Sequence, residues 1–226
     1  MSICDNINKV LNEIPKDVKL LAVSKTKSIE EMEEAYSCGL RDFGENKVQE
    51  IVRKSEEFHK DVRWHMIGNL QTNKVKYLVG KVELIHSLSS LKLLAQIEKD
   101  FGKHNEVANV LIQVNIGREE SKGGFLVEEL QDAINEIEKC KFVKVQGLMT
   151  ILPKGTDESN RKYFKELKKI FDMLQKNKYN NIYMKILSMG MTHDYKVAIE
   201  EGSNLIRIGE GIFGPRNYNL GGSINE

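Results

Sequence analysis

Short apolar runs alternate with longer amphipathic stretches along most of the chain. A run of about four to eight apolar residues between turn residues has the length of a buried strand and is too short for a helix. Apolar residues that recur about every three to four positions predict a helix with one buried face. The expected strands are 20–23, 40–43, 63–67, 82–86, 107–116, 143–149, 183–187 and 205–208, and the expected helices are 3–14, 28–38, 47–58, 71–78, 89–101, 127–139, 158–176 and 193–200.

This alternation of strands and helices predicts an α/β fold, a single (β/α)8 TIM-type barrel over residues 1–226 with an extra N-terminal helix. Helix boundaries support the pattern, since Pro15 stops the first helix and Ser28 begins the second. A doubly wound open sheet is the alternative. It is disfavoured because no Gly-x-Gly-x-x-Gly follows the first strand.

Composition narrows the class of protein. The 226 residues are 40% hydrophobic and 30% charged with a net charge of +1, which suits a globular protein and gives no strong field for nucleic acid or an anionic membrane. Neither a signal peptide nor an apolar run of about 18 residues is evident, so we expect a cytoplasmic protein. Cys4, Cys38 and Cys140 are odd in number and widely spaced, so we expect reduced thiols rather than a disulfide or metal site. No surplus apolar face is visible, and a monomer is expected.

Lys25 is the first candidate for chemistry. The strand at 20–23 leads directly to it, and the chemistry of such barrels sits at the carboxyl ends of the strands. Strand side chains alternate, so Lys25 shares a face with Leu21 and Val23, which disfavours its ammonium form. A neutral amine can attack an aldehyde to form an imine. An ordinary solvated lysine just past a strand end is the alternative.

The two last strand ends could supply an anion site beside Lys25, because strand eight of a barrel closes next to strand one. Glycines in Ser188-Met189-Gly190 and Gly209-Glu210-Gly211 permit close backbone approach, although they could also serve turns alone. Arg207 shares the inner face with Leu205 and, being buried, needs a partner such as a pyridine nitrogen or a carboxylate. An amine, a phosphate cradle and an arginine at one mouth fit pyridoxal phosphate (PLP).

Other polar residues near the strand ends are weaker candidates. Glu210 brings a negative charge into the proposed cradle, which opposes phosphate unless its side chain points outward. His65 and His86 lie at strand ends, where a hydrogen-bonded structural histidine is more common than an acid or base. The histidines show no metal-ligand spacing.

Several segments together resemble the pyridoxal phosphate homeostasis proteins, the YggS/PROSC family. They are Leu-Ala-Val-Ser-Lys-Thr-Lys at 21–27, Phe-Gly-Glu-Asn at 43–46, Trp-His-Met-Ile-Gly at 64–68, Leu-Gln-Thr-Asn-Lys at 70–74, Gln-Gly-Leu-Met at 146–149, Leu-Ser-Met-Gly-Met at 187–191 and Ile-Arg-Ile-Gly at 206–209. The resemblance implies a barrel like the N-terminal domain of alanine racemase, with PLP held as an imine on Lys25 and Arg207 facing the pyridine nitrogen. It also implies that Asn46 lies near the ring and that the phosphate contacts are Ser188, Gly190, Gly209 and Gly211.

The resemblance further implies a carrier or buffer of PLP that lacks catalytic activity and passes the cofactor to PLP-requiring apo-enzymes. A PLP-dependent racemase or decarboxylase of the same barrel type is the alternative, and a class I aldolase ranks last because no general acid or base can be named for it. The barrel consumes the chain as far as Gly214, which leaves only a Gly- and Asn-rich tail where racemases of this type add a closing domain. An open mouth admits water and weakens electrostatic stabilisation of a carbanion.

Overall fold

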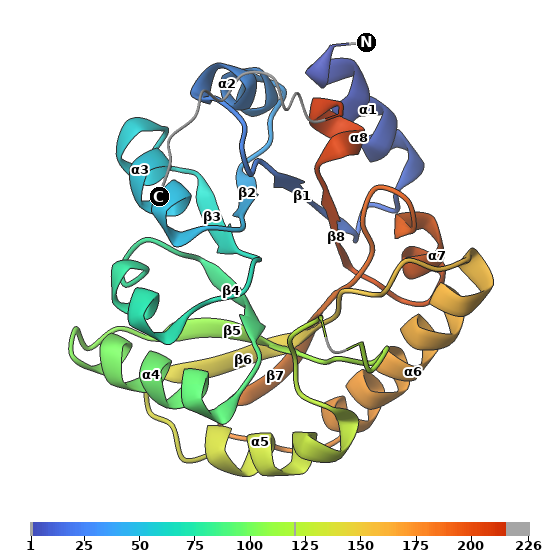
Figure 1. The fold of residues 1–226 in the computed structure, drawn as a ribbon. Helices are drawn as coiled ribbons and strands as arrows, with labels where there is room; N and C mark the ends of the chain where they lie inside the picture. The colour runs from blue at the N-terminus through green and yellow to red at the C-terminus, as the bar shows by residue number, and fades with distance from the viewer. Residues whose placement is uncertain (1, 120, 216–226) are drawn as a thin grey trace.

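The computed structural model describes residues 2–119 and 121–215, so the tail at 216–226 lies outside the described residues. Parallel strands close into one barrel in the order of the chain, with helices around the outside (Figure 1). The strands are β1 (Lys19–Val23), β2 (Asp42–Glu45), β3 (Arg63–Met66), β4 (Leu84–Leu88), β5 (Ala108–Gln113), β6 (Val143–Met149), β7 (Ile182–Ser188) and β8 (Leu205–Ile208). The predicted barrel is confirmed, including every predicted strand and the N-terminal helix.

Helices follow the strands and cover their outer faces. The α-helices are α1 (Ile3–Glu13), α2 (Ile29–Ser37), α3 (Val48–Glu57), α4 (Leu91–Gly102), α5 (Leu130–Ile137), α6 (Asp157–Gln175), α7 (Tyr195–Glu200) and α8 (Glu210–Phe213). Two 3₁₀ segments are η1 (Thr72–Tyr77) and η2 (Val127–Glu129). In the described part of the chain, no helix combines the length and the apolar character that a membrane crossing requires.

Three predicted helices differ from the structure, and the one predicted at 127–139 begins as the 3₁₀ segment η2 before it becomes α5. The segment at 71–78 is the 3₁₀ helix η1, which is consistent with its Thr, Asn and Val content, poor for an α-helix, and its early stop at Gly80. The helix after β7 begins at Tyr195 rather than at 193. Asp194 holds the preceding turn by accepting the Met191 N–H at 2.7 Å, so the helix starts later.

The barrel has an apolar outer interface and a more polar interior. On β3, Trp64 and Met66 join the large core between strands and helices, while His65 takes the alternate, inward position. Small apolar clusters fill parts of the interior, one of them formed by Leu21, Val23, Ile67 and Leu205. Buried polar side chains occupy the space that remains, which sets up the site described below.

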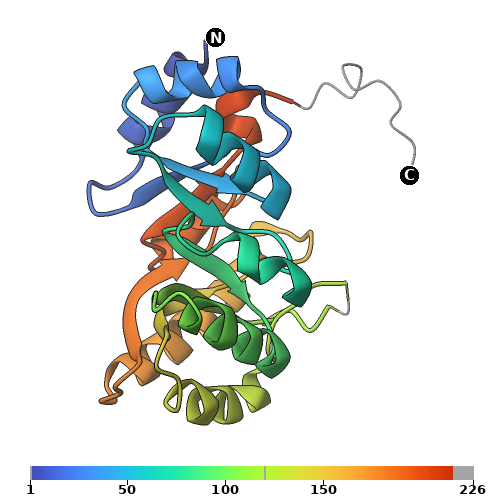
Figure 2. The same ribbon diagram turned by 90° about the vertical axis from the view of Figure 1, so that its left-hand side faces the viewer.

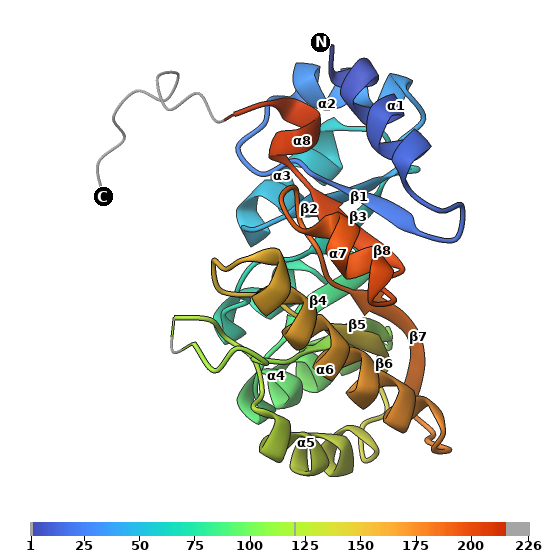
Figure 3. The ribbon, with the colours of Figure 1, turned by 90° about the vertical axis from the view of Figure 1, so that its right-hand side faces the viewer.

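Helices α1, α2 and α8 gather on one side of the barrel, and α4 and α5 lie on the opposite side (Figures 2 and 3). A disulfide joins Cys4 of α1 to Cys38 at the end of α2, with their Cα atoms 5.7 Å apart. The expectation that all thiols are reduced was therefore wrong. These cysteines are 34 residues apart in sequence, and only the packing of α1 on α2 brings them together. Cys140 remains a free thiol, and burial raises its pKa to about 11.

Candidate functional site

Lys25 stands just beyond β1, at the mouth of the barrel formed by the carboxyl ends of the strands. Its side chain is half-buried, and it lines a small pocket with Val23, Lys27, Gly209, Glu210 and Gly214. Parallel pairing of β1 with β8, in which Ala22 lies opposite Ile208, brings these segments together. The expectation that barrel closure places Lys25 beside Gly209 is confirmed, while its binding role stays a prediction.

A buried polar cluster holds the main chain on both sides of Lys25. Lys54 of α3 and Glu45 of β2 are fully buried, with Lys54 Nζ 2.8 Å from Glu45 Oε1. Lys54 also donates to the Ser24 carbonyl at 2.9 Å, and the Ser24 hydroxyl donates to Glu45 at 2.6 Å. On the other side, Glu50 accepts the N–H of Thr26 at 3.1 Å, where Thr26 has a φ of 64°. These contacts with α3 and β2 hold the main chain of residues 24–26 in place.

The two carboxyls of this cluster have pKa values that are shifted in opposite directions. Burial, together with the hydrogen bond to Glu50, raises the pKa of Glu45 to about 8. At Glu50, burial alone would raise the pKa, but hydrogen bonds from Glu45 and from the Thr26 N–H, together with nearby Lys54, lower it. Glu45 Oε2 is buried and makes no hydrogen bond among the described residues, which favours the neutral, protonated form of this carboxyl.

Arg207 of β8 lies beneath the same mouth and is 4% exposed. Its guanidinium donates to Ser188 Oγ at 2.6 Å and to the Thr150 carbonyl at 2.8 Å. Within the described residues no carboxylate forms an ion pair with it, although Asp194 lies near enough to favour its charged form. Burial lowers the pKa of Arg207 to about 10, so it stays charged at neutral pH. The sequence predicted a pyridine nitrogen or a carboxylate as the partner of Arg207, and no carboxylate of the described residues forms an ion pair with it.

The glycines of the last two loops have distinct surroundings. Gly190 has a φ of 95° and accepts the Arg207 N–H, and a Cβ on it would lie 2.7 Å from that of Ala198. The N–H of Gly211 donates to Thr192 Oγ1 at 3.3 Å, which ties the two loops together. A Cβ on Gly209 would lie 3.3 Å from Val23. Packing therefore gives Gly190 a structural reason to be glycine, whereas Gly209 borders the Lys25 pocket.

The other predicted site residues are also at this mouth. Asn46 directly follows β2. Its backbone lies so close to Gly68 that a Cβ on Gly68 would be 2.3 Å from the Asn46 carbonyl oxygen. Ser188 is fully buried, with its hydroxyl turned inward to Arg207 and His86. The Glu210 side chain is 57% exposed and 3.9 Å from His193, and Glu210 also lines the Lys25 pocket.

Sequence reasoning missed the roles of Lys54, Glu45 and Thr150. Lys54 carried a signal, because it follows the buried positions Val48 and Ile51 on the apolar stripe of α3. A lysine in such a stripe needs a buried partner. Glu45 alternates with Gly44 on β2 and shares a face with Phe43, so its orientation toward α3 could have been expected from the pleat.

Comparison with known proteins places this arrangement in a family. Residues 2–217 match the family model described as alanine racemase, N-terminal domain. A pyridoxal phosphate homeostasis protein from Aquifex aeolicus is 46% identical over 230 residues, which cover 96% of this chain and 100% of that protein. This chain belongs to the pyridoxal phosphate homeostasis protein family. A family relative from Helicobacter pylori is 43% identical over 200 residues, covering 87% of each chain.

Solved structures agree with that assignment. PipY of Synechococcus elongatus PCC7942, solved with PLP bound, superimposes with a TM-score of 0.86 at 30% identity and covers 94% of this chain and 100% of PipY. The structure of PipY without PLP gives a TM-score of 0.89 at 31% identity. Alanine racemase of Clostridium difficile 630 gives 0.75 at 16% identity, covering 96% of this chain and 57% of the racemase, which shows a shared fold alone.

Proposed function

We propose that this chain binds PLP at the seam between β1 and β8, through an imine with Lys25, and serves PLP homeostasis as a carrier or buffer without catalysis. The observation that carries the proposal is the position of Lys25 beside Gly209, with the charged Arg207 buried beneath the same mouth. Relatives named for PLP homeostasis and the PLP-bound PipY structure support it.

The residues present fit this cofactor. When bound, PLP supplies an aldehyde, which a lysine amine can capture. Residues 24–26 are held by the Glu45–Lys54–Glu50 cluster, which limits where the Lys25 amine can go. The hydrogen-bond partners of Arg207 are the neutral Ser188 Oγ and Thr150 carbonyl, which supports a role for its charge toward a ligand. The loops containing Gly190, Gly209 and Gly211 lie next to it and would hold the phosphate.

Arg207 also bears on the absence of catalysis. A guanidinium has only donors, so a ring nitrogen that faces it must accept the hydrogen bond and stay unprotonated. An unprotonated pyridine withdraws electrons weakly and stabilises a carbanion poorly. Holding and releasing the cofactor needs no such stabilisation. We expect the recipients to be PLP-requiring apo-enzymes in the cytoplasm, with this chain acting as a monomer.

The test is trapping of the adduct by borohydride, followed by absorbance and mass spectrometry of the protein. Wild-type protein should gain a reduced cofactor adduct on the peptide that contains Lys25, and Lys25→Ala should lose it while keeping weak, non-covalent binding. Lys27→Ala is the matched control, since Lys27 lines the same pocket. Wild-type protein that binds PLP but is never trapped at Lys25 would contradict the proposal.

A second measurement separates a carrier from an enzyme. Cofactor-loaded protein should activate a PLP-requiring apo-enzyme in proportion to the PLP it releases. Racemisation and decarboxylation of the common amino acids should stay at the rate of free PLP. Turnover well above that rate, abolished by Lys25→Ala, would replace the carrier with the racemase or decarboxylase alternative.

A further inference from the structure

A line of polar side chains crosses the inside of the barrel from Arg207 to the opposite mouth. Arg207 Nη1 is 2.6 Å from Ser188 Oγ, which is 3.2 Å from His86 Nδ1. His86 Nε2 is 2.9 Å from His65 Nδ1, and His65 Nε2 is 3.1 Å from Asp42 Oδ1. Strands β8, β7, β4, β3 and β2 supply these residues, and the contact between Ser188 of β7 and His86 of β4 crosses the interior between strands that are not neighbours. We call these five residues the relay.

The two ends of the relay fix the direction of every hydrogen bond in it. Arg207 can only donate, so the Ser188 oxygen accepts and its O–H is left to donate to His86 Nδ1. His86 must then carry its proton on Nε2 and donate to His65 Nδ1. His65 in turn carries its proton on Nε2 and donates to Asp42, which can only accept. With both imidazoles neutral, each therefore has one allowed tautomer.

The charges along the relay agree with this order. Burial, with His65 and Arg207 nearby, lowers the pKa of His86 well below its usual value, which keeps it neutral. Burial opposes ionisation of Asp42, but hydrogen bonds from His65 and Arg63 hold the pKa of its carboxyl below the usual range. The relay thus carries a cation at the cofactor end and an anion at the other.

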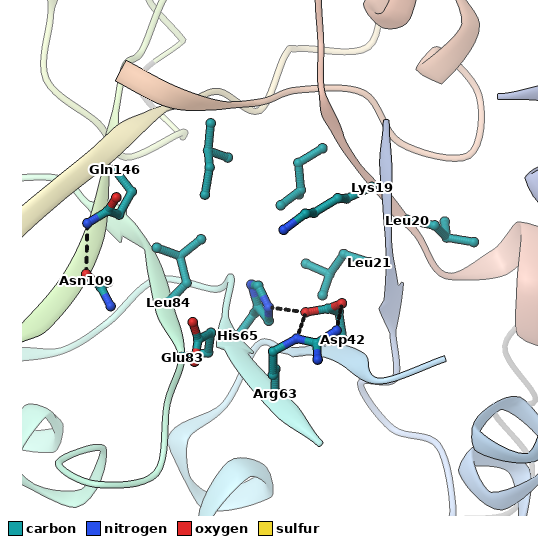
Figure 4. A pocket seen from close by; sticks show the side chains of 12 residues that line it. Lys19, Leu20, Leu21, Asp42, Arg63, His65, Glu83, Leu84, Asn109 and Gln146 are labelled. Atoms are coloured by element: carbon teal, nitrogen blue, oxygen red, sulfur yellow. Dashed lines mark hydrogen bonds and ion pairs between the residues drawn. The ribbon is translucent and has the colours of Figure 1, made fainter. Parts of the chain in front are cut away.

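The far end of the relay reaches solvent. Asp42 and His65 line a cavity of about 220 Å³ at the mouth formed by the starts of the strands, opposite Lys25 (Figure 4). Asp42 is 22% exposed, and Lys19, Arg63 and Glu83 line the same cavity. Solvent at this mouth therefore reaches the Asp42 end of the relay.

We propose that Ser188, His86, His65 and Asp42 are positioning residues that hold the Arg207 guanidinium for the cofactor ring, and that protonation of His65 from the opposite mouth resets this hold. The inference rests on the proposed PLP site. When His65 takes a proton on Nδ1, His86 Nε2 must become an acceptor, so the proton of His86 moves to Nδ1 and points at Ser188. The Ser188 O–H then loses its acceptor, and a second positive charge enters the interior with Arg207.

Groups on every element around His65 and His86 bear on this titration. They are Asp42 on β2, Arg63 on β3, Glu83 before β4, Lys19 on β1, Arg207 on β8 and Asp194 before α7. Of these groups, Asp42 is the one that hydrogen-bonds to His65 directly, at 3.1 Å.

The first test is nitrogen NMR of the histidine rings in the protein without cofactor. At neutral pH, His65 and His86 should both show the neutral form protonated on Nε2. A proton on His86 Nδ1, or a charged His86 at neutral pH, would overturn the inference. This measurement does not depend on PLP, so it stands even if the proposed function fails, which would show instead as a missing Lys25 adduct in wild-type protein.

The second test follows the absorbance of the PLP-loaded protein against pH. Asp42→Asn keeps an acceptor for His65 but removes the charge at the end of the relay, so the midpoint of the spectral change should differ from that of the wild-type protein. Glu83→Gln removes a charge from the same cavity without touching the relay, so it should move the midpoint by less than Asp42→Asn does. Equal midpoints for Asp42→Asn and wild type, in proteins with unchanged near-ultraviolet circular dichroism, would overturn the inference.

Discussion

Replacement of Lys54 by methionine is the sharpest test of the cluster behind Lys25. Methionine has a similar length, so Lys54→Met removes the charge and its hydrogen bonds while leaving little empty space. The perturbed contacts are the 2.8 Å pair with Glu45 and the 2.9 Å bond to the Ser24 carbonyl, both fully buried.

The expected cost follows from these contacts. Loss of one partner of a buried pair usually costs about 3–5 kcal/mol, because the other charge is left buried and unpaired. Here Glu45 can keep its proton, and the Ser24 carbonyl retains the N–H of Lys27 at 3.0 Å, so the cost should fall at the lower end. We expect about 3 kcal/mol, which corresponds to a fall in melting temperature of roughly 6–12 °C for a chain of this size.

Urea denaturation followed by circular dichroism measures this difference, with Lys47→Met as the matched control. Lys47 is exposed and lies at the start of the same helix, so its replacement should change the free energy of unfolding by less than about 0.5 kcal/mol. In addition, Lys54→Met should slow formation of the Lys25 adduct, since residues 24–26 lose a support. If the two variants were equally stable, the cluster would have no part in holding this segment.

Three further outcomes are expected. Because the pKa of Glu45 is raised from 4.5 to about 8, the folded state holds a proton that the unfolded state has lost between these two pH values, so the free energy of unfolding should fall from pH 4.5 to 8 and level off above. Glu45→Gln should flatten that slope in denaturation curves measured across this range. An unchanged slope would contradict the protonated form of Glu45. Double replacement of Cys4 and Cys38 by serine opens a link between residues 34 apart and should cost roughly 4 kcal/mol in non-reducing buffer, with thiol titration as the check that the bond was present. Gly190→Ala should cost about 2–4 kcal/mol from positive φ and overlap with α7, whereas Gly39→Ala, with a φ of 96° and open space around it, should cost only about 1 kcal/mol; equal losses would show that overlap is absent.

The order of elements and the closure of the barrel could be predicted from sequence because both depend on local patterns. Apolar runs of strand length mark the strands, and the closed parallel barrel follows from their alternation with helices. The same reasoning placed Lys25 beside Gly209, since the first and last strands of a barrel are neighbours.

Contacts between elements that are distant in both sequence and barrel order could not be predicted. The bond between Ser188 and His86 joins β7 to β4, and nothing in either segment reports the distance across the interior. The Cys4–Cys38 bond depends on how α1 packs on α2, which amphipathic patterns leave open. Lys54 was readable in part, because its place on an apolar stripe demanded a buried partner, but the partner's identity required coordinates.

The seam between β1 and β8 also bears on biosynthesis. Leu21 pairs with Arg207, so strands β2 to β7 are synthesised between the residues around Lys25 and those around Gly209. A nascent chain that has not yet released β8 from the ribosome has only half of the proposed site. Uptake of PLP would therefore mark the moment when the fold is complete, and a substitution that loosens this seam should abolish uptake before the helical signal declines.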